Sequence, residues 1–140
     1  MPGTILAFDV GTRRVGVAKA DPSPAIAFPL TTLIVSDHLV ADVQKVITET
    51  APSLLVVGLP RSQSGDESEQ STYSRSWVYQ FLLPLGIPVV FHDESTTSLL
   101  ARERLEAQGG NYRKEDVDAV AAQIILESYL SEQGGNNGRN

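Results

Sequence analysis

The sequence predicts one α/β domain, built on a mixed five-stranded sheet with helices on both faces. Two observations carry this prediction. The first third of the chain holds three β-rich runs separated by short turns, which pair most simply as an antiparallel meander. Helical and apolar segments then alternate, the pattern that adds parallel strands through helical crossovers. A length of 140 residues suits a single domain with its own core.

The meander follows from its runs and breaks. An apolar strand covers residues 5–8 and ends in Asp9. The turn 11–14 separates it from a second strand over 15–20. The two prolines within 21–24 make the next turn, because proline fixes φ and disfavours helix before it. The third strand then covers 25–33.

The remaining chain alternates helices and strands. A helix capped by Ser36 or Asp37 runs to Pro52, since its apolar residues recur at spacings of three and four. The wholly apolar run 54–57 predicts a strand covered on both faces. A second helix over 73–82, a strand over 87–91, and helices from Ser95 to Gly109 and over 115–130 complete the order. The domain therefore spans 1–131, and the Gly/Asn-rich residues 132–140 are expected to form a disordered tail.

Composition excludes several classes of protein. The chain has no cysteine, which removes disulfide frameworks, thiolate zinc sites and thiol nucleophiles. No apolar run approaches the ~20 residues of a membrane span, so a cytoplasmic location is expected. A net charge of −6 argues against gripping nucleic acid by bulk electrostatics alone.

Three carboxylates stand where chemistry is expected. Asp9 ends the first strand, Glu94 follows the last strand, and Asp118 lies in the first turn of the last helix. The carboxyl ends of parallel strands share one edge of a sheet, so these groups can converge. Converging carboxylates repel unless a cation lies between them, and oxygen ligands favour Mg²⁺ or Mn²⁺. The plainer interpretation stays open: a turn cap, a helix N-terminal acid and a surface glutamate.

Four sequence blocks resemble a known family. Leu-Ala-Phe-Asp-Val-Gly-Thr-Arg-Arg-Val-Gly-Val-Ala at 6–18 resembles the opening motif of the YqgF family. Val-Val-Gly-Leu-Pro at 56–60 with Gly65, His-Asp-Glu at 92–94 with Thr96 and Thr97, and Asp-Ala-Val-Ala-Ala at 118–122 resemble its later blocks, in family order. That family comprises bacterial proteins of ribonuclease-H-like fold, described as Holliday junction resolvases or nucleases of precursor ribosomal RNA. The similarity covers about residues 4–130.

The resemblance implies a ribonuclease-H-like nuclease acting on structured nucleic acid, in 5′-end processing of pre-16S rRNA, Holliday junction resolution or both. It assigns Asp9, Glu94 and Asp118 as the catalytic, metal-binding triad, with Asp9 bridging two Mg²⁺ or Mn²⁺ ions. The products would carry 5′-phosphate and 3′-hydroxyl ends. Ser95 stands where the family usually has arginine, so a charge that could orient Glu94 or touch phosphate is absent there.

Arginines near the motifs are candidates for binding the nucleic-acid backbone, because guanidinium matches phosphate geometry. Arg13, Arg14 and Arg61 are the first choices, with solvated turn arginines as the competing interpretation. A second group could form a phosphate-facing patch or merely a solvated face of mixed charge. Its members are Arg102, Arg104, Arg113 and Lys114, with Glu103, Glu106 and Glu115 nearby.

Two other functions stay open. Asp-x-Gly-Thr after a strand also resembles the phosphate-binding hairpin of actin and sugar-kinase ATPases, although these need two lobes and a second hairpin. The other is a non-catalytic binding module of the same fold, associated with ribosome maturation or transcription. The expected partner is structured RNA or branched DNA, bound by a monomer or weak homodimer. Two divalent ions would bring the charge from −6 to about −2, which predicts weak, metal-assisted binding.

Overall fold

The structure is a computed structural model that describes residues 3–60, 68–93 and 97–137. Its elements are β1 (Ile5–Val10), β2 (Arg14–Ala20), β3 (Ala27–Ile34), α1 (Leu39–Thr50), β4 (Leu54–Leu59), α2 (Glu69–Phe81), the 3-10 turn η1 (Leu83–Leu85), β5 (Val89–Asp93), α3 (Thr97–Ala107) and α4 (Lys114–Asn137). No described helix is both long enough and apolar enough to cross a membrane.

The five strands form one mixed sheet in the order β3-β2-β1-β4-β5. The meander pairs antiparallel, β1 with β2 and β2 with β3, whereas β4 lies parallel to both β1 and β5. The predicted fold class is therefore confirmed. β1 sits at the centre of the sheet. Because β4 runs parallel to β1, the carboxyl ends of these two strands lie at the same edge of the sheet.

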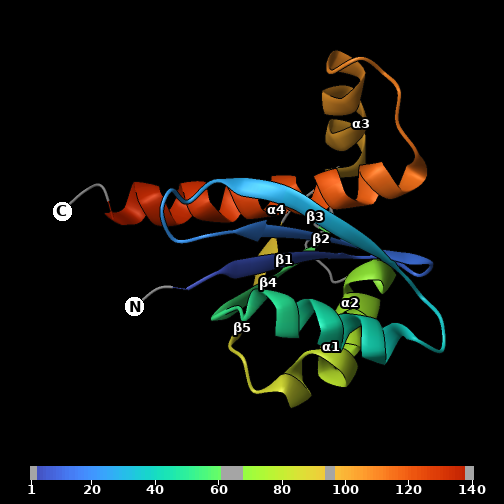
Figure 1. Ribbon diagram of the computed structural model, residues 1–140, viewed down its shortest axis with the longest axis vertical. Coiled ribbons are helices and arrows are strands. Elements are labelled where there is room, and N and C mark those ends of the chain that lie inside the picture. The colour runs from blue at the N-terminus through green and yellow to red at the C-terminus, as the bar shows by residue number, and fades with distance from the viewer. Residues whose placement is uncertain (1–2, 61–67, 94–96, 138–140) are drawn as a thin grey trace.

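Helices cover the two faces unequally. α1 and α2 pack on one face, α4 crosses the other, and α3 stands away from the sheet beyond α4 (Figure 1). Alternation along β1 directs Leu6, Phe8 and Val10 toward α1 and α2. Ala7 packs toward α4, and Asp9, two residues on, shares that face.

Large side chains fill the face under α1 and α2. Trp77 of α2 is buried, with its ring centroid 5.9 Å from that of Phe8 and 5.0 Å from that of Phe81. Leu39 and Val43 of α1 belong to the same cluster. Tyr73, one turn before Trp77, packs against this cluster as well.

The face under α4 carries small residues instead. A Cβ atom on Gly16 of β2 would lie 1.9 Å from the carbonyl oxygen of Asp118, and one on Gly58 of β4 would lie 2.5 Å from Cδ1 of Ile125. The Asp118 carbonyl is backbone and leaves no room for a side chain, so Gly16 is needed where α4 crosses the sheet, whereas the atom facing Gly58 is the end of a flexible side chain that can shift. Alanines line the rest of this contact: Ala7, Ala18, Ala20, Ala27 and Ala122.

Helix ends differ from the sequence prediction in two places. The predicted cap, Ser36 or Asp37, is not found: His38 directly precedes α1 and no side chain caps the helix. Ser36 Oγ accepts a hydrogen bond from the His38 N–H (3.1 Å), which lies outside the helix. α4 continues through Asn137, so the predicted disordered tail is helical over 132–137. Adding residues to a formed helix costs little, and Glu132 Oε2 lies 3.6 Å from Nδ1 of His92, a contact that the sequence does not reveal.

Candidate active site

A cavity of about 400 Å³ opens where β1 and β4 end. The ends of the two strands supply its floor, and α2, α3 and α4 each add residues to its wall. Asp9 and Asp118 both line it. Two residues that are 109 positions apart in the chain, at 9 and 118, thus face one space.

Local structure explains why both carboxylates arrive there. Asp9 occupies the α4 face of β1 by strand alternation, beyond Ala7. Asp118 lies near the start of α4, and its own carbonyl rests against Gly16, the residue paired with Asp9 across β1 and β2. The close helix–sheet contact therefore sets the position of Asp118 relative to Asp9.

Among the described residues that line this cavity, Arg14 is the cation. Its Nε donates to Oδ2 of Asp118 at 2.5 Å, which joins the start of β2 to α4. The hairpin that delivers Arg14 is closed by the Gly11 N–H, which donates to the Arg14 carbonyl at 3.0 Å. A Cβ on Gly11 would lie 2.7 Å from that oxygen, so this position requires glycine.

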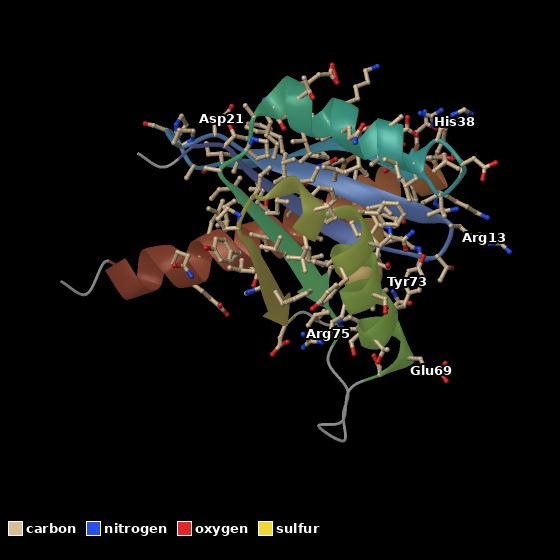
Figure 2. The ribbon with its side chains drawn as sticks, turned by 90° about the horizontal axis from the view of Figure 1, so that it is seen from below. Arg13, Asp21, His38, Glu69, Tyr73 and Arg75 are labelled. Atoms are coloured by element: carbon tan, nitrogen blue, oxygen red, sulfur yellow. The ribbon has the colours of Figure 1, made fainter. Side chains whose placement is uncertain are left out.

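Of the other two arginine candidates, Arg13 and Arg61, the structure describes only Arg13. Arg13 is exposed and lies at the outer edge of the molecule (Figure 2), and it does not line the cavity. Arg13 is therefore separate from the cavity that Arg14 lines, and its predicted contact with the nucleic-acid backbone stays a prediction. Arg61 falls outside the described residues.

Burial controls the charge of Asp9. Desolvation in the cavity raises the pKa of Asp9 from 3.8 to about 6, and the negative charge of Asp118 adds to the effect. Ionised Asp9 thus costs free energy in this environment unless a cation compensates it. A hard divalent cation between the two carboxylates would oppose both causes, so the oxygen donors present fit such an ion.

The predicted triad is represented here by two of its members. Glu94 lies outside the described residues, as does Ser95. Within residues 3–60, 68–93 and 97–137, no group of three or more His, Asp or Glu side chains is arranged to hold a metal ion. The described set is the pair Asp9 and Asp118.

The acidic neighbours of the predicted ligands lie elsewhere. Asp93 is exposed. The residue before it in β5, His92, faces α4, where its Nε2 lies 2.8 Å from Ser128 Oγ, so Asp93 faces the other side of the strand. Asp116 Oδ2 accepts the Arg113 N–H at 2.9 Å and so closes the start of α4. Neither Asp93 nor Asp116 lines the cavity, so neither joins Asp9 as a ligand candidate.

Sequence patterns missed two cavity residues. Gln70 of α2 donates from Nε2 to the Val10 carbonyl at 2.8 Å, which fixes the end of β1 beside Asp9. Ser98, near the start of α3, lines the wall next to Arg14 and Asp118. Neither stands in a motif, and single polar residues at the start of a helix give no signal of their own.

The architecture is that of ribonuclease-H-like resolvases of the RuvC type. Thermus thermophilus RuvC, solved in complex with a Holliday junction substrate, superposes with a TM-score of 0.57 at 15% identity, over 94% of this chain and 96% of that one. Fowlpox virus resolvase, solved with Holliday junction DNA, gives 0.57 at 12% identity, over 93% and 98%. At such identities the likeness establishes the fold.

The chain belongs to the RuvX family, described as Holliday junction resolvase, whose family model matches residues 3–132. A relative from Chromobacterium violaceum is 40% identical over 134 residues, covering 92% of this chain and 98% of its own. One from Aeromonas hydrophila is 39% identical over 137 residues, covering 94% and 97%. Both carry the name "Putative pre-16S rRNA nuclease". The predicted YqgF resemblance is thereby confirmed.

Proposed function

We propose that this protein is a divalent-metal-dependent nuclease that hydrolyses phosphodiester bonds of structured nucleic acid. The observation that carries the proposal is the convergence of Asp9 and Asp118, from distant segments, in one cavity beside Arg14. The names of the relatives and family support two substrates, the 5′ end of pre-16S rRNA and the Holliday junction.

Asp9 and Asp118 would hold the metal, with Glu94 as the third ligand expected from the sequence. When bound, Mg²⁺ or Mn²⁺ supplies Lewis acidity toward phosphate and activates water, and two ions suit a phosphodiester best. The chain contributes a fixed set of oxygen donors, held on a strand and a helix rather than on loops.

Arg14 and Gln70 act as positioning residues in this scheme. The Arg14 hydrogen bond fixes the orientation of the Asp118 carboxylate, and Gln70 holds the end of β1 through the Val10 carbonyl. Asp9 must be ionised to accept a cation, so its raised pKa makes metal uptake fall as the pH drops below about 6. Acid conditions should therefore suppress cleavage.

The decisive experiment compares cleavage of a four-way DNA junction, duplex DNA and structured RNA, side by side with Mn²⁺. Wild type should cut at least one of them, while Asp9→Asn and Asp118→Asn should lose activity by about 10²-fold or more, since each removes a proposed metal ligand. Asp93→Asn is the matched control: it makes the same chemical change at an exposed carboxylate that does not line the cavity, and it should cleave like wild type.

The pattern of outcomes separates the alternatives. Cleavage by Asp9→Asn at the wild-type rate would refute the assignment of the site. Failure of wild type to cleave any substrate, together with no Mn²⁺ or Mg²⁺ binding, would favour the non-catalytic binding module instead. Preference among the three nucleic acids identifies the substrate, and symmetric junction cutting would additionally require two copies of the site.

A further inference from the structure

A second cavity lies on the other side of the Arg14–Asp118 pair. Its volume is about 450 Å³, and it shares Arg14, Ser98 and Asp118 with the cavity that holds Asp9, called the acidic cavity below. The rest of its lining comes from α3, the connection after it and the start of α4: Arg102, Tyr112, Arg113, Lys114 and Val117. The two cavities are therefore neighbours that share Arg14, Ser98 and Asp118.

The charges of the two cavities differ sharply. Besides the shared Asp118, the second cavity has no acidic lining residue among those described, whereas Arg102, Arg113 and Lys114 add three cations to Arg14. Among the described residues, none of these three side chains makes an ion pair with a carboxylate. Arg104, only two positions from Arg102, instead pairs with Glu127 at 2.9 Å and does not line the cavity.

Two nearby carboxylates accept hydrogen bonds from neutral donors of the α3–α4 connection. Glu106 Oε1 accepts from the Tyr112 hydroxyl at 3.0 Å, and Asp116 Oδ2 accepts from the Arg113 backbone N–H. These two bonds shape the α3–α4 connection, and neither carboxylate lines the cavity. A solvated face of mixed charge, the plainer interpretation of this region, would leave arginines and carboxylates paired without such separation.

We propose that this cavity binds a backbone phosphate of the nucleic acid, next to the phosphate that lies at Asp9 and Asp118. The proposal rests on the proposed function and extends it with a second subsite. A strand that crosses the Arg14–Asp118 pair passes from the acidic cavity into the basic one. The guanidinium of Arg102 or Arg113 suits a phosphate there, because its planar donors match two phosphate oxygens.

The test measures binding separately from cleavage. In an Asp9→Asn background, R102Q/K114Q removes two cations of the basic cavity. The matched control R104Q/K45Q removes the same charge from two residues that line neither cavity beside Asp118. Fluorescence anisotropy then follows a labelled single-stranded RNA and a labelled four-way DNA junction across a salt series, with circular dichroism to verify folding of every variant.

The expected result is a weaker salt dependence for R102Q/K114Q alone. Each lost phosphate contact should reduce the slope of log affinity against log salt by about 0.7 on a single strand and about 0.9 on duplex arms. The control should keep the slope of its parent. A response on only one of the two probes supports the subsite and identifies which nucleic acid enters it.

Two results would overturn the subsite: equal slope changes in both double variants, or no binding of either probe by the parent. Failure of the proposed function would look different. If a protein with Asp9 intact cleaves nothing, yet R102Q/K114Q selectively lowers the slope, the binding subsite stands and the nuclease assignment falls. Cleavage with unchanged slopes would instead remove the subsite and leave the nuclease assignment in place.

Discussion

Burial of Asp9 lowers the stability of the folded protein by an amount that depends on pH. The folded protein holds the pKa of this carboxyl at about 6, against 3.8 for an ordinary aspartate. Between these values the unfolded chain releases a proton that the folded chain keeps, so the stability of the folded state falls as the pH rises. Above about pH 6 the cost is complete, at no more than about 3 kcal/mol.

Asp9→Asn should therefore stabilise the metal-free protein near neutral pH by up to about 3 kcal/mol, and change it little near pH 4. Urea denaturation in the presence of a chelator, at both pH values, measures the difference. Mn²⁺ should raise the stability of wild type but not of the variant. If the variant is less stable than wild type at neutral pH without metal, ionised Asp9 does not destabilise the folded protein.

Gly16 determines whether α4 can reach the sheet. Gly16→Ala places a methyl group 1.9 Å from the Asp118 carbonyl oxygen, a backbone atom that cannot move without displacing the helix. We expect a loss of about 2–3 kcal/mol or more in the free energy of unfolding. Thermal and urea denaturation provide the measurement.

Gly134→Ala makes the same change at an exposed position of α4 with nothing within 4 Å of the new Cβ. It should leave stability unchanged or raise it by about 0.5–1 kcal/mol through helix propensity. Similar effects from both glycine substitutions would contradict the packing account of Gly16.

Some of the site could be predicted from residues, and some could not. Strand alternation places Asp9 on a definite face, and the motifs single out Asp118. The Arg14–Asp118 pair and the contribution of Gln70 depend on how α4 and α2 pack, which no local pattern encodes. Arg13 and Arg14 looked equivalent in the sequence, and only the hairpin geometry separates them.

At the scale of elements, α1 shows both the strength and the limit of sequence patterns. Its apolar spacing predicts the helix and the burial of Leu39, Val43 and Val46 correctly, whereas Val40, which the same spacing assigns to the buried face, is exposed. Its end is less regular: Ala51 adopts a left-handed conformation with φ 47° and donates its N–H to the Ile47 carbonyl. Pro52 indicates that the helix stops, but it does not reveal that an alanine takes the strained capping position.

Ala51→Gly should stabilise the protein by about 0.5–1 kcal/mol, because glycine adopts this backbone conformation without the Cβ clash. The position is exposed, so no packing is lost. Ala41→Gly, at an exposed position inside the same helix, should destabilise by about 0.5–1 kcal/mol. Chemical denaturation of both variants measures these opposite signs, and matching signs would refute the role assigned to Ala51.

α4 is the element that most exceeds its sequence prediction. The pattern gives its apolar face correctly, since Val117, Val120, Ala121, Ile124 and Leu126 are buried. Its full length could not be predicted because the last turns lack apolar periodicity. The contacts of Ser128 and Glu132 with His92 join residues that are far apart in the sequence, so no local pattern reveals them. The same helix carries Asp118, lines both cavities and ties β3 through Gln123 Nε2, which donates to the Ala27 carbonyl at 3.0 Å.

At the scale of the whole molecule, a net charge of −6 must be reconciled with a polyanionic substrate. The structure separates the signs: a carboxylate pair in one cavity and a group of cations in the next. Total charge is thus a poor guide to what a strand meets at this edge. The sequence supplies the charges, but their separation arises only when α3 and α4 fold together.

The double variant D9N/D118N changes the net charge from −6 to −4 and frees Arg14. Without divalent ions it should therefore bind a DNA junction more tightly than wild type, because two negative charges beside the strand are gone. With Mg²⁺ at matched ionic strength the order should reverse, since wild type alone gains cations at the site. Anisotropy titrations test this, and an unchanged order in Mg²⁺ would contradict metal-assisted binding.

The division of the core into two layers has an optical consequence. The chain has a single tryptophan, Trp77, and it lies in the layer of α1 and α2, across the sheet from α4. Its emission reports solvent entry on that side alone, whereas far-ultraviolet dichroism sums all the helices, including the 24 residues of α4 on the other side. Melting curves recorded with the two signals should coincide if both layers unfold together. They should have different midpoints if the layer that contains Asp118 unfolds first.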